Sequence, residues 1–360
     1  DSKINSFQQV LGSRGATGDA HELPPPLPDL AIPEAAAAPD DGHYALGTSL
    51  LANEFHPVLI FGTRATGKTT FLTSMLSFFT SMPDAGVTVT LGDPLSHTDV
   101  GSQAHESAER LFHVQVNDYL AGTAPVQNQD AFPFFVPLEL RKAGSSRITK
   151  IALMESSGEL WQSNNYKNNV LQLRKEILEI YRTYRAPLSV MIVVPYAMSE
   201  AYTGEETREN DLPDFRMSDT SLLQALQIYQ RYRPAGIKDE FYFVLTKWDM
   251  HTAQIASEEF INPDDILVAA LIEERFPRAF NYFKSMATEI RSRYTVYSAG
   301  LIGGTKVLEV PAHLMPMLQE FPYRLWRWIF ANATGGEDLY AASERPRGGR
   351  IRRFFGELFS

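Results

Sequence analysis

Residues 57–70 contain the residue types and the spacing needed to bind a polyphosphate. They include Gly-x-x-x-x-Gly-Lys-Thr, a pattern in which backbone N–H groups surround phosphate oxygens. Glycines are needed because such a loop adopts dihedrals unfavourable for other residues and approaches its ligand closely. Lys68 would neutralise the outer phosphates, and the Thr69 hydroxyl would bind Mg²⁺. The residues expected to contact the nucleotide phosphates are Gly62, Thr63, Arg64, Ala65, Thr66, Gly67, Lys68, Thr69 and Thr70.

The residues on either side of this loop predict the two elements that it requires. The apolar run 58–61 is typical of a buried strand, and apolar residues between 71 and 79 recur at mostly helical spacing. A helix beginning near Gly67 would direct its positive end and its free N–H groups at the phosphates. The alternative interpretation is a chance match on an ordinary strand, turn and helix.

A carboxylate further along the chain can select the base. Asp249 could accept hydrogen bonds from N1–H and the 2-amino group of guanine, whereas adenine has no donors at these positions. The stem of Lys247 can lie along the purine face, and Thr246 can tether the loop. Thr246-Lys247-Trp248-Asp249 looks like the [NT]KxD box of GTPases, with Trp248 expected to pack beneath the base loop.

A second loop would complete base recognition. Ser298-Ala299 looks like the SA[KL] box of GTPases, in which a backbone N–H meets guanine O6. Gly300 stands in the third position of that box and departs from it. Both base-binding segments follow predicted strands, which is where functional loops of an α/β sheet lie.

A third segment supplies a carboxylate close to the phosphates. Glu155-Ser156-Ser157-Gly158 stands where GTPases carry D-x-x-G, with Glu in place of Asp as a second departure. The Glu155 carboxylate would order water on Mg²⁺, and the Gly158 N–H would reach the γ-phosphate. Glu159 follows, where many GTPases have a Gln that orients the attacking water. A carboxylate there could orient water, accept its proton or be inert.

The first switch of a GTPase, whose Thr hydroxyl meets Mg²⁺ when GTP is bound, is harder to place. Thr98 and Thr123 are the candidates, and Thr123 is preferred because it lies closer to the predicted hairpin. Asn128 is a possible substitute. Arg64, inside the phosphate loop, either leans over the γ-phosphate or points to solvent, and solvent is favoured.

The order and spacing of these motifs between residues 57 and 331 resemble those of TRAFAC-class P-loop GTPases. Within that class, the ExxGE segment and the long insertion before the hairpin look like the bacterial double-GTPase families. The resemblance implies GTP and GDP with Mg²⁺ as ligands, slow hydrolysis of GTP, and a nucleotide-dependent switch. It also implies a protein partner, which in such families is often a second GTPase.

Apolar runs alternating with helical patterns predict a doubly wound α/β fold with a mostly parallel sheet and one antiparallel edge strand. Pro133 and Pro137 are expected to confine the strand 132–140 to the edge. The other expected strands are 87–91, 147–154, 188–194, 241–245 and 294–297. The expected helices are 102–120, 166–184, 222–232, 263–293 with a break at Pro277, and 312–331. In the last helix, an aromatic group at 326, 328 and 330 is expected to pack on the sheet.

Composition shifts divide the chain into three parts. Residues 1–44 are rich in Pro and Ala and are not expected to fold, and 45–332 form the GTPase domain with insertions near 92–130 and 196–220. Residues 333–360 form a tail, and within it 345–360 reads as a basic amphipathic helix. That helix could lie on an anionic membrane surface, in a partner's groove or against the domain itself.

Charge and composition exclude several classes of protein. A net charge of −10 argues against a general nucleic-acid binder, and the absence of cysteine excludes disulfides and thiolate metal sites. The eight histidines show no zinc spacing, and no run of 18 apolar residues exists. We expect a cytoplasmic protein, with peripheral contact at the inner face of the membrane if the tail binds lipid. The rival functions are a hydrolysis-deficient nucleotide-binding scaffold and an ATP-using P-loop enzyme.

Overall fold

The computed structural model describes residues 46–62, 66–82, 85–96, 98–126, 133–156, 175–196, 219–248, 263–286, 290–299, 302–303, 306–307 and 315–340. The chain divides into two units, 1–39 and 40–360, and every described residue belongs to the second. The expectations for residues 1–44, for most of the insertion near 196–220 and for the basic tail 345–360 lie outside the described residues.

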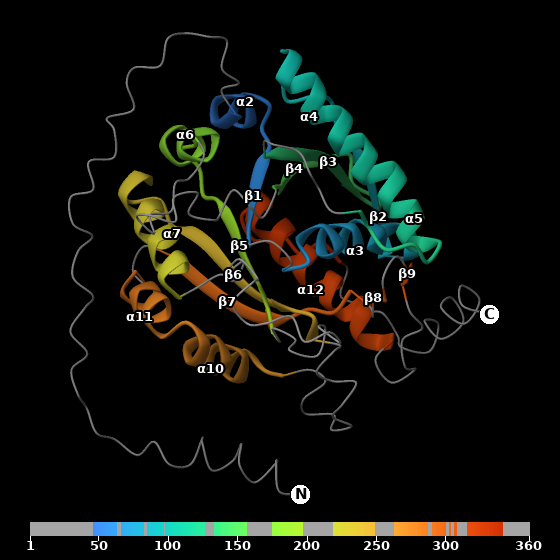
Figure 1. The fold of residues 1–360 in the computed structure, drawn as a ribbon. Coiled ribbons are helices and arrows are strands. Elements are labelled where there is room, and N and C mark those ends of the chain that lie inside the picture. Colours follow the sequence, from blue (N-terminus) through green and yellow to red (C-terminus); the bar gives the residue numbers. More distant parts are fainter. Residues whose placement is uncertain are drawn as a thin grey trace, which may run out of the picture. The chain divides into compact units, whose positions relative to one another are not determined.

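A seven-stranded sheet forms the centre of the second unit (Figure 1). Its strands are β1 (His56–Phe61), β2 (Val87–Leu91), β3 (Phe134–Lys142), β4 (Ile148–Glu155), β5 (Ser189–Pro195), β6 (Asp239–Thr246) and β7 (Ile290–Val296). Their order across the sheet is β2-β3-β4-β1-β5-β6-β7. β3 runs antiparallel to both neighbours, and the other pairs are parallel. The predicted α/β class with a mostly parallel sheet is therefore confirmed. Two short strands, β8 (Ile302–Gly303) and β9 (Lys306–Val307), form a separate antiparallel pair.

Helices cover both faces of this sheet. They are α2 (Leu46–Ala52), α3 (Lys68–Ser81), α4 (Asp99–Glu109), η2 (Arg110–Gln115), α5 (Val116–Leu120), α6 (Lys175–Thr183), α7 (Asp219–Tyr232), α10 (Asp265–Arg275), α11 (Pro277–Ser285) and α12 (Met315–Thr334). The alternation along β6 shows the two faces, because successive side chains of a strand point in opposite directions. Phe241 and Phe243 pack on Phe283 of α11, whereas Tyr242 packs on Trp328 of α12.

The core follows directly from the apolar runs in the sequence. β1 and β5 are buried along their whole length, as expected of central parallel strands that are covered on both faces. In α12, Trp326 and Phe330 are buried with Trp328, and Trp326 Nε1 donates to Met75 O of α3. The prediction that this group packs the last helix on the sheet is confirmed for Trp328, whose ring contacts Tyr242 of β6, whereas Trp326 packs on Phe79 of α3.

The expectation that prolines confine 132–140 to the sheet edge is wrong, because β2 lies outside β3. The pairing of β2 with β3 ends at Leu91 and Leu138, and the next carbonyl, Pro137 O, accepts from Gly92 N at 2.8 Å. In a β-strand the N–H and C=O of one residue face the same side. The missing N–H of Pro137 therefore faces the end of the β2 ladder, where its absence costs little.

The expected helical region to residue 293 also ends too late. α11 ends at Ser285, and the following strand β7 begins at Ile290 rather than at Tyr294. The expected start at 263 is two residues early, because α10 begins at Asp265 and Asp264 is its N-cap, accepting from Leu267 N at 2.8 Å. The sequence analysis also missed α2, whose Leu46 and Leu50 are fully buried.

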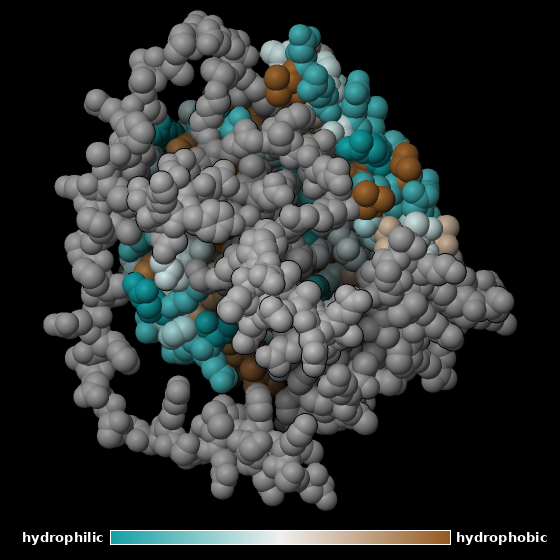
Figure 2. All heavy atoms as spheres, in the orientation of Figure 1, coloured by the Kyte–Doolittle hydropathy of each residue, from teal (hydrophilic) through white to brown (hydrophobic). Residues whose placement is uncertain are grey.

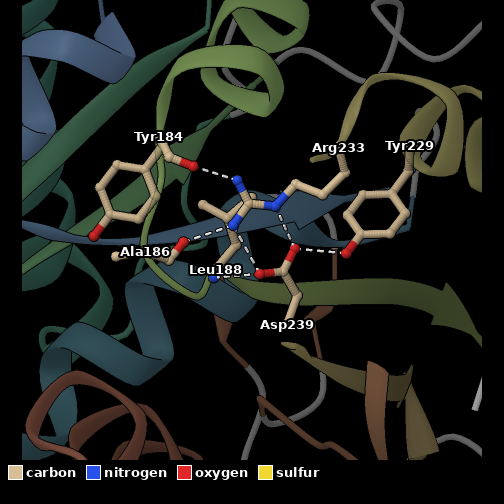
Figure 3. Close-up of polar contacts among 6 residues, drawn as sticks. All are labelled: Tyr184, Ala186, Leu188, Tyr229, Arg233 and Asp239. Carbon is tan, nitrogen blue, oxygen red and sulfur yellow. Dashed lines mark hydrogen bonds and ion pairs between the residues drawn. The ribbon is translucent and has the colours of Figure 1, made fainter. Parts of the chain in front are cut away.

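A buried ion pair connects α7 to the start of β6. Arg233 Nε lies 2.6 Å from Asp239 Oδ2, and Arg233 Nη2 lies 2.8 Å from Asp239 Oδ1, with both side chains almost fully buried. The other hydrogen bonds of the two charges go to Tyr184 O, Ala186 O, the Leu188 N–H and the Tyr229 hydroxyl (Figure 3). These contacts fix the amino end of β6, so that its carboxyl end is presented to the predicted nucleotide loops.

None of the described helices combines the length and the apolar character needed to cross a bilayer.

Candidate functional site

The loops singled out by the sequence follow four strands of the sheet. The P-loop (residues 62–69) follows β1, and Glu155 ends β4, the parallel neighbour of β1. The TKWD loop (residues 246–249) follows β6, and the SA loop (residues 297–299) follows β7, the parallel neighbour of β6. Because these strands run in the same direction, their four loops emerge at one edge of the sheet.

Two glycines shape the described part of the P-loop in different ways. A Cβ on Gly62 would lie 2.8 Å from both Thr66 Oγ1 and Val193 O, so only glycine fits between the loop and β5. Gly67 has open space around it but adopts φ +82°, a left-handed conformation that favours glycine. It is the N-cap of α3, so the free N–H groups of this helix begin at the loop. Thr63, Arg64 and Ala65 lie outside the described residues.

Lys68 is a buried cation inside the loop. Its side chain folds back so that Nζ donates to Gly62 O at 2.7 Å. Burial lowers the pKa of Lys68 to about 8, against the opposing effect of the negative charge of Glu155. The ammonium is thus poorly solvated, and an anionic ligand would stabilise its charged form.

Thr69 and Glu155 bring oxygen ligands together beside this lysine. The Thr69 hydroxyl donates to Glu155 Oε1 at 2.9 Å, and Glu155 is 1% exposed. A hydroxyl and a carboxylate are the hard oxygen donors that Mg²⁺ prefers, so the two residues fit this cation. No cluster of three or more His, Cys, Asp or Glu side chains suited to a metal occurs in the described segments. Thr70 lies beside Thr69 in the first turn of α3, whereas Gly158 and Glu159 fall outside the described ranges.

The TKWD loop is attached to the P-loop. Thr246 is buried, and its hydroxyl donates to Thr66 O at 2.7 Å. The tethering role predicted for Thr246 thus has a defined acceptor. Lys247 adopts φ +60°, a left-handed conformation uncommon for a residue other than glycine, which marks a constrained loop. Trp248 is fully buried against Tyr196, as expected of a residue packed beneath the loop. Asp249 lies just beyond the described segment.

The SA loop continues the pairing of β6 with β7 beyond the strands. Tyr297 N donates to Leu245 O at 2.7 Å, and Trp248 N donates to Tyr297 O at 3.3 Å. Ser298 is buried, and its hydroxyl makes no hydrogen bond with any residue that the structure describes. These bonds place Ser298 and Ala299 beside the TKWD loop.

The first-switch candidates have different surroundings. The Thr98 side chain accepts from Gly101 N at 3.1 Å and therefore serves as the N-cap of α4. Thr123 is exposed after α5, and its backbone N–H bonds to Asp118 O at 2.8 Å. Within the described part of the chain, no hydrogen bond joins the Thr123 side chain to Thr69 or Glu155. Its metal-binding role stays a prediction, and Asn128 lies outside the described residues.

One contact of this site was not predicted. The hydroxyl of Tyr119, on α5, donates to Ala299 O in the SA loop. The local sequence holds no signal for it, because Ala104, Ala108, Phe112 and Val116 recur at regular four-residue steps, as in an uninterrupted α-helix.

Comparisons with known proteins give little further information. No protein-family model and no curated protein matches this sequence. One solved structure with detectable similarity is the signal recognition particle receptor SRb-GTP/SRX complex from Chaetomium thermophilum, at 16% identity and a TM-score of 0.39. The match covers 76% of this chain and 97% of that chain. At this level of similarity it assigns no function, and the fold rests on the sheet topology described above.

Proposed function

We propose that this protein binds GTP with Mg²⁺, hydrolyses it slowly and acts as a nucleotide-dependent switch. The observation that carries the proposal is the hydrogen bond from the Thr246 hydroxyl to Thr66 O at 2.7 Å. It joins a loop with guanine-binding residue types to a loop with phosphate-binding residue types. This contact supports the interpretation of two short sequence matches, each of which could arise by chance, as parts of a single site.

In this proposal the chain's own residues bind and orient the nucleotide. Lys68 would leave Gly62 O and bind the outer phosphates, while the N–H groups at the start of α3 surround them. Thr69 and Glu155 would hold Mg²⁺, directly or through its water shell, and its charge would offset that of the phosphates. Gly158 would bind the γ-phosphate, and Glu159 would orient the attacking water.

Base selection would be shared by the two adjoining loops. The Asp249 carboxylate would accept from N1–H and the 2-amino group of guanine, with the stem of Lys247 along the ring. The Ala299 N–H would donate to O6, supported by the bonds that tie the SA loop to β6. Loss of the γ-phosphate would then release the loops near Gly158 and Thr123 and change the surface offered to a protein partner.

The experiment that tests the proposal uses a substitution that should change the preferred nucleotide from GTP to xanthosine triphosphate. Asp249→Asn replaces one acceptor with a donor, so the variant should prefer xanthosine triphosphate, which has a carbonyl at position 2. We expect the wild type to bind GTP at least about a hundredfold more tightly than either xanthosine triphosphate or ATP. Asp249→Asn should instead bind xanthosine triphosphate more tightly than GTP. Asp93→Asn, on an exposed residue after β2, is the matched control and should behave as the wild type.

Each outcome of this experiment separates the rival functions. Equal binding of ATP and GTP would overturn the guanine assignment and leave an ATP-using P-loop enzyme. A clear GTP preference without phosphate release would favour a hydrolysis-deficient scaffold. The proposals of a second GTPase as partner, and of a cytoplasmic protein that touches the membrane through 345–360, rest on the sequence resemblance and on the basic tail.

A further inference from the structure

The helical insertion between β2 and β3 has two halves, α4 and α5, that pack on different elements. In α4, Ala104 and Ala108 are buried, and this helix packs on β3. After the change, Val116 is buried where α5 packs beside α3, the helix that begins at the P-loop. The outer surface of the insertion is mainly hydrophilic, with isolated hydrophobic residues (Figure 2). The two halves are therefore fixed by different neighbours.

A π-helical segment joins these two halves. Residues 110–115 form η2, and Val116 N donates to Leu111 O, five residues back. The wider turn accommodates one residue more than an α-helix would, so both Leu111 and Val116 face inward. In a regular α-helix, two positions five apart point about 140° away from each other. The π-turn thus sets the direction of the residues that follow it, including Tyr119.

Tyr119 reaches the SA loop as a result. Its hydroxyl donates to the carbonyl of Ala299, which is 180 residues away in the sequence. Ala299 is the residue whose N–H is assigned to guanine O6 in the proposed function. The carbonyl of that residue is accordingly held by a segment that belongs to an insertion in the fold.

The other side of the SA loop is fixed through Tyr297. Its backbone is bonded to Leu245 and Trp248, and its hydroxyl donates to Ser74 Oγ of α3 at 3.0 Å. Its ring packs edge-on against Phe71, with 4.7 Å between the two ring centroids. The Ala299 N–H therefore lies between two fixed points, the Tyr297 backbone and its own hydrogen-bonded carbonyl.

The sequence gives a reason why this second fixed point matters. The residue after Ala299 in the sequence is Gly300, the residue type with the widest range of allowed backbone dihedrals. An external hydroxyl on the Ala299 carbonyl restricts the loop from the other side. It reduces the entropy that would be lost when the N–H is ordered against a base.

We infer that Tyr119 is a positioning residue for recognition of the purine 6-position, and that the π-helical insertion is part of the base-binding site. This inference rests on the proposed function. Tyr119 acts through Ala299 and does not itself touch the nucleotide.

The test compares GTP with 6-thioguanosine triphosphate, which differs from it by sulfur in place of O6 and is the weaker hydrogen-bond acceptor. We expect the wild type to prefer GTP by about tenfold, and Tyr119→Phe to reduce this preference to about twofold or less. Tyr282→Phe is the matched control, because it removes a tyrosine hydroxyl bonded to Gln230 between α7 and α11. That control should keep the wild-type preference.

The outcomes separate this inference from the proposed function. Equal weakening of both nucleotides by Tyr119→Phe would show a general structural role and overturn the inference. An unchanged preference in Tyr119→Phe would also overturn it while leaving the GTP site intact. A wild type that binds neither guanine nucleotide would overturn the proposed function and the inference with it.

Discussion

The Thr69 hydroxyl donates a hydrogen bond to Glu155 Oε1 at 2.9 Å and so joins the first turn of α3 to the end of β4. If the two residues hold one Mg²⁺, then removing either should remove most of the benefit that the cation gives. We expect Thr69→Val and Glu155→Gln each to lower the Mg²⁺-dependent gain in GTP affinity by about tenfold or more. The double variant should lose little beyond either single variant, because the two act as a unit.

Titration of GTP with Mg²⁺ and with a chelator measures this effect. Thr80→Val, at the exposed far end of α3, is the control and should retain the full gain. Fully additive losses in the double variant would contradict a shared cation.

If the protein binds GTP as proposed, the buried Lys68 should make that binding depend on pH. Burial lowers the pKa of Lys68 to about 8, and the phosphates bind its charged form. Between pH 7 and 8.5 the charged fraction of the free protein falls, so GTP affinity should decrease about fourfold. Lys68→Arg keeps its charge over this range and should show a flat profile, whatever its absolute affinity. Calorimetry across this pH interval makes the measurement, and a steep profile in the Arg variant would assign the effect to another group.

The bond from Thr246 to the P-loop should matter for ligand binding as well as for folding. Thr246→Val keeps the side-chain shape but leaves Thr66 O without this donor, which should lower the free energy of unfolding by about 1–3 kcal/mol. GTP affinity should fall about tenfold or more, because the two loops are no longer held together. Thr246→Ser restores the hydroxyl and should recover most of the affinity. If both variants bind GTP equally well, the tether does not couple the loops.

His56 should make folding stability sensitive to mild acid. Burial lowers its pKa from 6.5 to about 4, and its Nε2 lies 2.8 Å from Ser189 Oγ. Between pH 6.5 and 4 the unfolded chain binds more protons than the folded one, so the free energy of unfolding falls as pH falls. The loss can reach about 3 kcal/mol. Urea denaturation at pH 7 and pH 4.5 should show a larger drop for the wild type than for His56→Phe. An equal drop in both would exclude His56 as the source.

Replacing one partner of the Arg233–Asp239 ion pair should destabilise the fold strongly. Replacing both partners together should destabilise it less than the sum of the two single replacements. Removing one partner leaves the other charge buried, so Arg233→Met or Asp239→Leu should lower the free energy of unfolding by about 3–5 kcal/mol. The double variant, Arg233→Met with Asp239→Leu, should be less destabilised than the sum of the two. Chemical denaturation of the three variants tests this, and strictly additive losses would contradict it.

The sequence predicted most of what depends on local patterns. The central strands are continuous apolar runs, and the loops that hold the candidate nucleotide-binding residues follow β1, β4, β6 and β7. What it missed depends on neighbours far away in the chain. The tolerance of Pro137 depends on where β2 stops, and the acceptor of Tyr119 lies 180 residues away. Arg233 finds two of its acceptors, Tyr184 O and Ala186 O, 49 and 47 residues away, so no local spacing marks them.

The pairing of β6 with β7 continues beyond the ends of the strands, because the backbone hydrogen bonds of Tyr297 extend it into the TKWD loop and the SA loop. The amides of Tyr297 and Trp248 should therefore exchange with solvent deuterium only when this side of the sheet opens, and not by local fraying of a loop. If a nucleotide binds as proposed, its base would therefore lie against the part of the site that opens most slowly. We expect the dissociation rate of a bound nucleotide to be set by opening on the phosphate side, where a regulatory partner would have to act.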